Sequence, residues 1–212
     1  PENMLKVKVC GITDADNAKA IAETRIDFAG FIFYPGSKRY VGEMPDNRLF
    51  ENIPESVVKV GVFVNENPST VMGISRFAGI EMVQLHGNET VSYCGSLRSC
   101  GLKVIKAFRI GSKTDLQLIN AYSDVCDYFL FDSSTGSYGG SGTKFNWQII
   151  EGAGFSKPFF LSGGIGPEDA HLLKKITCNM FFAADINSRF EVKPGIKDTD
   201  KVKKFTDQIR NL

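Results

Sequence analysis

The sequence predicts an α/β fold, a single-domain (β/α)8 barrel that spans residues 1–212. Short β-rich runs alternate strictly with amphipathic stretches, which indicates a parallel sheet with crossover helices. Eight such units follow one another without a shift in composition, and eight units in one domain indicate a closed barrel. An open, doubly wound sheet is the main alternative. It usually has fewer units and a nucleotide-binding G-x-G-x-x-G after its first strand, and no such motif follows the first run here.

The predicted strands are short runs rich in apolar and β-branched residues, bounded by turn residues. The first run ends in Cys10, and its alternation places Lys6, Lys8 and Cys10 on one face. Gly11 supplies a turn directly after it. In chain order the eight runs cover residues 5–10, 27–33, 57–64, 81–85, 103–108, 127–131, 158–161 and 180–184.

The predicted helices fill the stretches between these runs. Thr13 or Asp14 is placed to cap the first helix, and Asn67-Pro68 opens the third, because proline is favoured in the first turn of a helix. A glycine-rich loop at residues 136–144 separates the sixth strand from its helix. The helices are expected near residues 14–24, 46–53, 68–78, 89–99 and 113–121, from Asn146, from Gly166, and at 198–210.

Composition excludes several classes of protein. The 25 basic and 24 acidic residues give a net charge of +1, which argues against nucleic-acid binding. No apolar run approaches the roughly 20 residues that span a bilayer, and the first residues lack the features of a secretion signal. The five cysteines are scattered and form no C-x-x-C pair, which favours a reducing compartment over a disulfide framework or zinc site. We expect a cytoplasmic protein without nucleic-acid or membrane partners.

Polar side chains stand at the carboxyl end of nearly every predicted strand. In a (β/α)8 barrel these ends meet on one face, and the active site is built there. The sequence therefore predicts a catalytic site on that face. Its candidate residues are Cys10, Ser37 to Arg39, Gln84, His86, Arg109, Asp132, Ser162, Gly163, Gly164 and Asp185 to Arg189.

The loops after the seventh and eighth strands form a candidate phosphate site. Gly163 and Gly164 let backbone N–H groups approach an anion closely, and Asn187, Ser188 and Arg189 add amide, hydroxyl and guanidinium donors. Barrels of this kind commonly hold a phosphate at these two loops. Tight turns with no ligand are the alternative, since glycine is common after strands.

Cys10 and Asp132 are candidates for proton transfer. A lone cysteine is more often a buried, inert residue, but Lys8 shares its face, and a nearby cation favours the thiolate. Asp132 either caps the following loop or, in a dry pocket, serves as a general acid. A base and an acid on one rim suit proton transfer on a small substrate, without a hydride carrier or metal. His86 has no second histidine at ligand spacing, so no metal site is expected, and residues 136–144 suit a lid or a surface connection.

The chain resembles the phosphoribosylanthranilate isomerases, the small barrel enzymes of tryptophan biosynthesis. The resemblance covers essentially the whole sequence and rests on several segments in the right order. They are KVKVCGIT (6–13), GFIFYPGSKRYV (30–41), VGVFVNE (60–66), VQLHG (83–87), FD (131–132), GGSGTKFNW (139–147), LSGGI (161–165) and PGIKD (194–198).

The resemblance implies a cofactor-free Amadori rearrangement of a phosphorylated small molecule. Asp132 would be the general acid that opens the ribose ring, and Cys10 the general base that removes the C2 proton. Arg39 would meet the anthranilate carboxylate. The remaining implied residues are Gln84, His86 and Asp185 around the substrate, and Gly163, Gly164, Asn187, Ser188 and Arg189 around the phosphate.

Two departures from the family pattern concern loops. Asn187 to Phe190 stands where the family has a small Ser-Gly pair, so the phosphate contact of Arg189 is an open question. Asn146 stands where the family has an aspartate, and asparagine can cap the following helix as aspartate does.

Two other functions are alternatives to this one. Another phosphate-binding barrel enzyme would need metal ligands if it were an epimerase, or an inward lysine such as Lys8 or Lys106 if it were a Schiff-base lyase. A catalytically inactive binding module would lack Cys10 or Asp132, and both are present. The oligomeric state is left open between a monomer and a homodimer.

Overall fold

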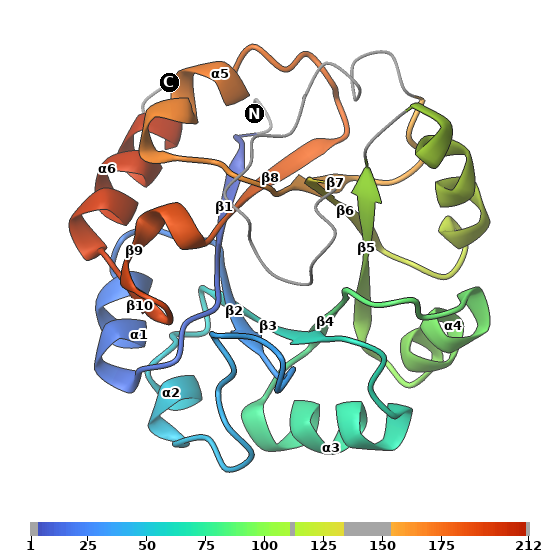
Figure 1. Cartoon of the computed structure of the whole chain (residues 1–212), viewed down its shortest axis with the longest axis horizontal. Coiled ribbons are helices and arrows are strands. Elements are labelled where there is room, and N and C mark those ends of the chain that lie inside the picture. The colour runs from blue at the N-terminus through green and yellow to red at the C-terminus, as the bar shows by residue number, and fades with distance from the viewer. Residues whose placement is uncertain (1–3, 111–112, 134–153, 211–212) are drawn as a thin grey trace.

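Eight parallel strands close into a barrel in the order β1 to β8 (Figure 1). The structure is a computed structural model that describes residues 4–110, 113–133 and 154–210. β8 pairs with β1, with Lys8 opposite Asp185, and this pairing closes the ring. The predicted (β/α)8 barrel is thus confirmed. The strands are β1 (Lys6–Cys10), β2 (Phe28–Ile32), β3 (Val58–Phe63), β4 (Met82–Leu85), β5 (Lys103–Ile110), β6 (Tyr128–Ser133), β7 (Phe159–Leu161) and β8 (Phe181–Ile186).

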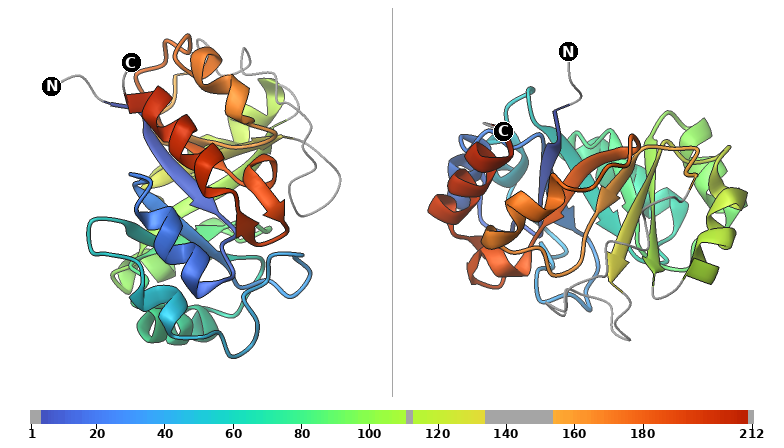
Figure 2. Two further views of the ribbon diagram at one scale, coloured as in Figure 1. Left: turned by 90° about the vertical axis from the view of Figure 1, so that its left-hand side faces the viewer. Right: turned by 90° about the horizontal axis from the view of Figure 1, so that it is seen from above.

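The helices lie outside the ring of strands (Figure 2). Two of the predicted caps are present: Asp14 accepts a hydrogen bond from the Asn17 backbone N–H, and Asn67 accepts one from that of Ser69. The helix predicted from Asn146 and the loop at 136–144 lie outside the described residues. The helices are α1 (Ala15–Ala22), α2 (Arg48–Glu51), α3 (Pro68–Ala78), α4 (Val91–Ser99), the 3₁₀ helices η1 (Lys113–Tyr122) and η3 (Pro167–Asp169), α5 (Ala170–Leu173) and α6 (Thr199–Arg210).

Three segments differ from the prediction. The helix expected at 46–53 is only the single turn α2, which stops before Pro54 because the residue preceding a proline disfavours helical geometry. β8 extends past residue 184, so Asp185 stands inside the strand and not after it. After β8 and the short 3₁₀ helix η4 (Ser188–Phe190), the chain forms an unpredicted hairpin of β9 (Glu191–Lys193) and β10 (Ile196–Lys197).

Two apolar regions stabilise the barrel. A large cluster fills the space between strands and helices, and a smaller one fills the interior of the ring. In the interior, Phe28 and Phe160 pack edge to face with ring centroids 5.2 Å apart. A polar layer of Lys8, Gln84 and Asp185 lies in the same ring, and all three residues are buried. Among the described residues no helix is long and apolar enough to cross a membrane.

Candidate active site

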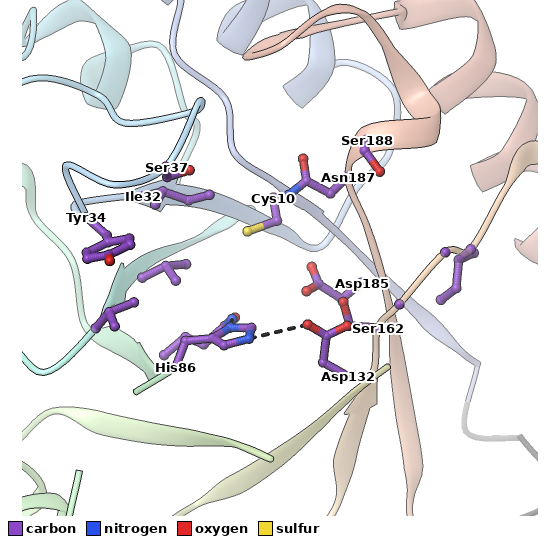
Figure 3. A pocket seen from close by; sticks show the side chains of 16 residues that line it. Cys10, Ile32, Tyr34, Ser37, His86, Asp132, Ser162, Asp185, Asn187 and Ser188 are labelled. Carbon is purple, nitrogen blue, oxygen red and sulfur yellow. Dashed lines mark hydrogen bonds and ion pairs between the residues drawn. The ribbon is translucent and has the colours of Figure 1, made fainter. Parts of the chain in front are cut away.

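A cavity opens at the carboxyl ends of the strands, where the sequence predicted the site (Figure 3). Most of the predicted site residues line it. The thiol of Cys10 and the carboxyl groups of Asp132 and Asp185 lie around one space, although they come from β1, β6 and β8. The lining residues are Cys10, Ile32, Tyr34, Ser37, Val62, Val64, Gln84, His86, Asp132, Ser162 to Ile165, Asp185, Asn187 and Ser188.

Two glycines shape the surroundings of Cys10. Gly30 is its register partner on β2, and a Cβ at that position would lie 3.0 Å from the Cys10 Sγ atom, so glycine leaves room for the thiol. Gly11 has a φ of +77°, which glycine adopts without strain. A Cβ at Gly11 would also come within 2.7 Å of the Arg39 side chain. β1 therefore ends with the Cys10 thiol at the cavity wall, and the chain turns away from the cavity at Gly11.

Burial controls the acidity of Cys10. The thiol is 4% exposed, and this burial raises the pKa of Cys10 above its ordinary value. The charges of Lys8 and Lys197 act in the opposite direction but are the smaller effect. Lys8 does favour the thiolate, as its place on the same face indicated, but the net effect of the surroundings is to raise the pKa of Cys10. The sequence shows that a cation is near, but it does not show how completely the thiol is removed from water.

Polar side chains form a continuous chain from the barrel interior to Asp132. The Lys8 ammonium donates to Gln84 Oε1 at 2.7 Å and to Asp185 Oδ1 at 2.9 Å. Gln84 Nε2 lies 2.9 Å from His86 Nδ1, and His86 Nε2 lies 3.3 Å from Asp132 Oδ2. Burial opposes the positive charge of Lys8, but Asp185 and Cys10 together outweigh it and the pKa of Lys8 is raised. Lys8 therefore stays an ammonium.

The candidate phosphate loops meet at one end of the cavity. Gly163 and Gly164 have φ values of +98° and +69°, so the backbone after β7 turns in a way that favours glycine at both positions. Asn187 and Ser188 line the cavity beside them. The side-chain oxygen of Asn187 accepts a hydrogen bond from Lys197 at 2.6 Å, which leaves its amide nitrogen directed toward Cys10 (Figure 3).

None of the three candidate arginines, Arg39, Arg109 and Arg189, lines the cavity. Arg39 donates two hydrogen bonds of 2.7 Å to the carboxylate of Glu191 and does not line the cavity, although Ser37 of the same loop does. Arg189 pairs with Glu168 at 2.6 Å on the surface, and it does not line the cavity either. The substrate contact of Arg39 and the phosphate contact of Arg189 stay predictions.

The hairpin β9–β10 contributes two functional candidates that sequence reasoning missed. Glu191 binds both Arg39 and Lys197, and Lys197 in turn holds Asn187. Burial raises the pKa of Glu191, but these partners outweigh it, and the pKa is lowered. The Pro194-Gly195 pair, with Val192 before it and Ile196 after it, was the available signal for a hairpin turn. Nothing local marked Glu191, because its partner Arg39 is far away in sequence.

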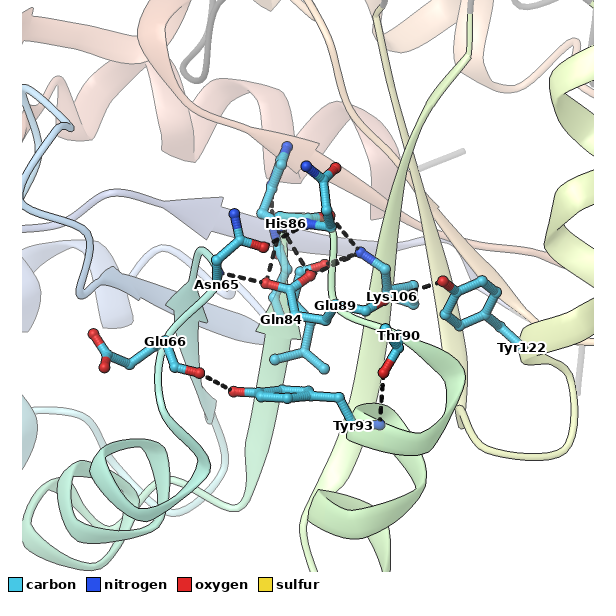
Figure 4. Close-up of polar contacts among 12 residues, drawn as sticks. Asn65, Glu66, Gln84, His86, Glu89, Thr90, Tyr93, Lys106 and Tyr122 are labelled. Atoms are coloured by element: carbon cyan, nitrogen blue, oxygen red, sulfur yellow. Dashed lines mark hydrogen bonds and ion pairs between the residues drawn. The ribbon is translucent and has the colours of Figure 1, made fainter.

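The lysines considered for a Schiff-base lyase are both engaged in ion pairs. Lys8 binds Asp185 and Gln84, and Lys106 binds Glu89 at 2.9 Å with both side chains buried (Figure 4). Neither lysine lines the cavity. His171, the other histidine of the chain, is exposed on α5.

The closed barrel and the polar cavity at the carboxyl ends of its strands define the chain as a (β/α)8-barrel enzyme. The family model of N-(5'phosphoribosyl)anthranilate (PRA) isomerase matches residues 7–208. The chain therefore belongs to the N-(5'-phosphoribosyl)anthranilate isomerase family, and it is an isomerase of tryptophan biosynthesis, as the sequence resemblance implied.

Individual relatives agree with the family match. The N-(5'-phosphoribosyl)anthranilate isomerase of Phocaeicola vulgatus is 41% identical over 96% of this chain and 97% of its own length. The crystal structure of the Thermotoga maritima phosphoribosyl anthranilate isomerase has a TM-score of 0.88 at 36% identity, and it covers 99% of this chain and 100% of its own. A second such isomerase, crystallised with reduced 1-(o-carboxyphenylamino)-1-deoxyribulose 5-phosphate, has a TM-score of 0.85 at 32% identity over 99% of this chain and 100% of its own.

Proposed function

We propose that the chain catalyses its Amadori rearrangement by general acid–base chemistry, with Asp132 as the acid and Cys10 as the base. Asp132 gives a proton to the ribose ring oxygen of N-(5'-phosphoribosyl)anthranilate, and the ring opens to a protonated Schiff base. Cys10 then removes the proton from C2, which leaves an enol. Tautomerisation of the enol gives 1-(2-carboxyphenylamino)-1-deoxyribulose 5-phosphate, and no cofactor is consumed.

The placement of Cys10 and Asp132 in one cavity is the observation that carries this proposal. The two groups come from β1 and β6, so a substrate between them can give a proton at one atom and receive one at another. A phosphorylated compound closely related to the product is bound in one solved relative. The loops after β7 and β8 would hold the phosphate through Gly163, Gly164, Asn187 and Ser188.

The other predicted roles are part of the same proposal. Gln84, His86 and Asp185 would surround the substrate, and Arg39 would meet its carboxylate once it exchanges Glu191 for the ligand. Arg189 lies on the surface and is paired with Glu168, so we assign it a smaller share of phosphate binding than the residues that line the cavity. The cytoplasmic location, the absence of nucleic-acid partners and the choice between monomer and homodimer stay predictions.

The purified protein should consume N-(5'-phosphoribosyl)anthranilate without an added metal or cofactor. The measurement is the loss of substrate fluorescence with time. Product formation is checked by chromatography, with authentic carboxyphenylamino-deoxyribulose phosphate as the standard. Dialysis against a chelator should leave the rate unchanged, because the proposed chemistry uses only Asp132 and Cys10. A rate no faster than the uncatalysed reaction would exclude the proposal.

Inorganic phosphate should stabilise the folded chain. A ligand that binds only the native state adds RT ln(1 + [L]/Kd), which is about 2.7 kcal/mol at a concentration of 100 Kd. Thermal unfolding with increasing phosphate should therefore show a rising Tm, and sodium chloride at matched ionic strength is the control. A Gly164→Val variant should lose the phosphate-dependent rise, because a β-branched residue is strained at a φ of +69°. An unchanged Tm at millimolar phosphate would count against the anion site.

A further inference from the structure

We propose that Lys8 and Gln84 are positioning residues that hold His86 as one tautomer, with its proton on Nε2, so that the ring donates a hydrogen bond to Asp132. The inference rests on the proposed function, because it assigns a purpose to the contact between His86 and the general acid. It adds that a buried ammonium in the barrel interior determines how a ring at the cavity wall is protonated.

The ammonium of Lys8 determines the orientation of the Gln84 amide. Lys8 is fully buried, carries three N–H donors and has no acceptor. Its partner 2.7 Å away must therefore be the amide oxygen of Gln84. The flipped amide would place an NH₂ group against an ammonium inside the barrel, and two buried donors facing each other would both lose a hydrogen bond. Asp185 holds the ammonium in place from the other side at 2.9 Å.

The oriented Gln84 amide determines the tautomer of His86. With the oxygen of Gln84 directed at Lys8, its NH₂ group is the atom 2.9 Å from His86 Nδ1. An NH₂ group only donates, so Nδ1 must be the bare, accepting nitrogen of the ring. In the neutral imidazole the proton then resides on Nε2.

The protonated Nε2 faces Asp132. The distance from Nε2 to Asp132 Oδ2 is 3.3 Å, and both side chains are only 19% exposed (Figure 3). A donor at Oδ2 leaves Oδ1 as the oxygen of Asp132 that can carry the acidic proton. The same N–H stabilises the carboxylate that remains when Asp132 has given its proton away. The opposite tautomer would set a nitrogen lone pair against that carboxylate.

The backbone at His86 is fixed independently of this chain of hydrogen bonds. The Lys106 ammonium donates to the carbonyl oxygens on both sides of His86, those of Leu85 at 3.1 Å and Gly87 at 2.8 Å (Figure 4). The backbone N–H of His86 donates to the Phe63 carbonyl oxygen at 2.9 Å. The ring position therefore does not depend on Gln84, and a change at Gln84 can alter the tautomer without moving the loop.

Nitrogen NMR of the histidine rings tests the tautomer directly. The chain has only two histidines, and a His171→Gln variant removes the exposed one and assigns the signals of His86. Protonated and bare ring nitrogens give well-separated ¹⁵N signals. At mildly alkaline pH, where histidine rings are neutral, we expect a bare Nδ1 in the wild type. In Gln84→Glu the new carboxylate accepts from both neighbours, so Nδ1 should carry a proton and its bare-nitrogen signal should disappear.

The kinetic consequence separates positioning from folding. Gln84→Glu should lower kcat by about 10- to 100-fold, since general acid catalysis contributes about 10²- to 10⁴-fold and its orientation is lost. Because Gln84 lines the cavity, KM should rise as well, but by a smaller factor than kcat falls. His171→Gln should leave kcat unchanged. A Lys8→Met variant, which frees the Gln84 amide to flip, should show signals of both tautomers; if it does not fold, Gln84→Glu decides.

Two results would overturn the inference. One is a bare Nδ1 that persists in Gln84→Glu, and the other is a wild-type kcat in a protein whose tautomer has switched. Failure of the proposed function would give a different result. Full activity in Asp132→Asn would exclude Asp132 as the general acid, while the tautomer of His86 would stay as described.

Discussion

Replacing Cys10 with alanine should lower kcat by about 10³-fold, the middle of the range for a positioned general base. Alanine fills the same place beside Gly30 but cannot accept the C2 proton. The rate is measured with N-(5'-phosphoribosyl)anthranilate under saturating conditions. Binding of reduced 1-(o-carboxyphenylamino)-1-deoxyribulose 5-phosphate should remain close to that of the wild type, because the base contributes to the proton transfer and not to holding the substrate.

A matched cysteine separates lost chemistry from lost stability. Cys94 is also buried, but it packs on α4 outside the ring of strands, so Cys94→Ala should destabilise the fold by about 1 kcal/mol and keep full activity. Cys10→Ala should show a similar small loss in denaturant unfolding. If Cys10→Ala turned over substrate at nearly the wild-type rate, another group would have to be the base.

The pH dependence of the wild type should carry the signature of a buried thiol. Burial raises the pKa of Cys10, so the thiolate is scarce at neutral pH and its fraction grows as the pH rises. The kcat/KM of the wild type should therefore still increase above neutral pH, and this limb should be absent from the residual activity of Cys10→Ala.

The fold and the residues at the strand ends could be predicted from the sequence because both follow from local patterns. Strand periodicity alone places Cys10 at the carboxyl end of β1 and Asp132 near that of β6, and the closure of the barrel brings such ends together. The same periodicity put Lys8 on the face of Cys10, and Lys8 is indeed buried inside the ring. What the pattern could not supply was the balance between a neighbouring charge and the loss of water around the thiol.

The positions of the arginines could not be predicted for a related reason. Arg39 follows β2, whereas its partner Glu191 begins β9, and only the folded barrel brings the two together. The hydrogen-bond chain through Gln84 is another example. Its direction depends on which atom of the amide faces Lys8, and this is a property of packing across β1 and β4 that no motif records.

Replacing Asp132 with asparagine should also lower kcat by about 10³-fold, because the amide has the shape of the carboxyl group but no proton to give to the ring oxygen. Its oxygen can still accept the His86 N–H, so the ring of His86 should keep its position and tautomer. Binding of the reduced, open-chain product analogue should persist, since that ligand has no ring to open. The rate is measured by the same fluorescence assay, and binding by calorimetry.

Asp127, which directly precedes the first residue of β6, provides the control for this change. The carboxylate of Asp127 accepts hydrogen bonds from the Val104 backbone at 2.9 Å and from Arg98 at 3.2 Å, far from the cavity lining. Asp127→Asn should therefore weaken the fold by about 1 kcal/mol and leave kcat unchanged. A large loss of activity in both variants would indicate general damage to β6. A loss confined to Asp132→Asn ties the defect to the cavity end of the strand, where the acid is proposed to act.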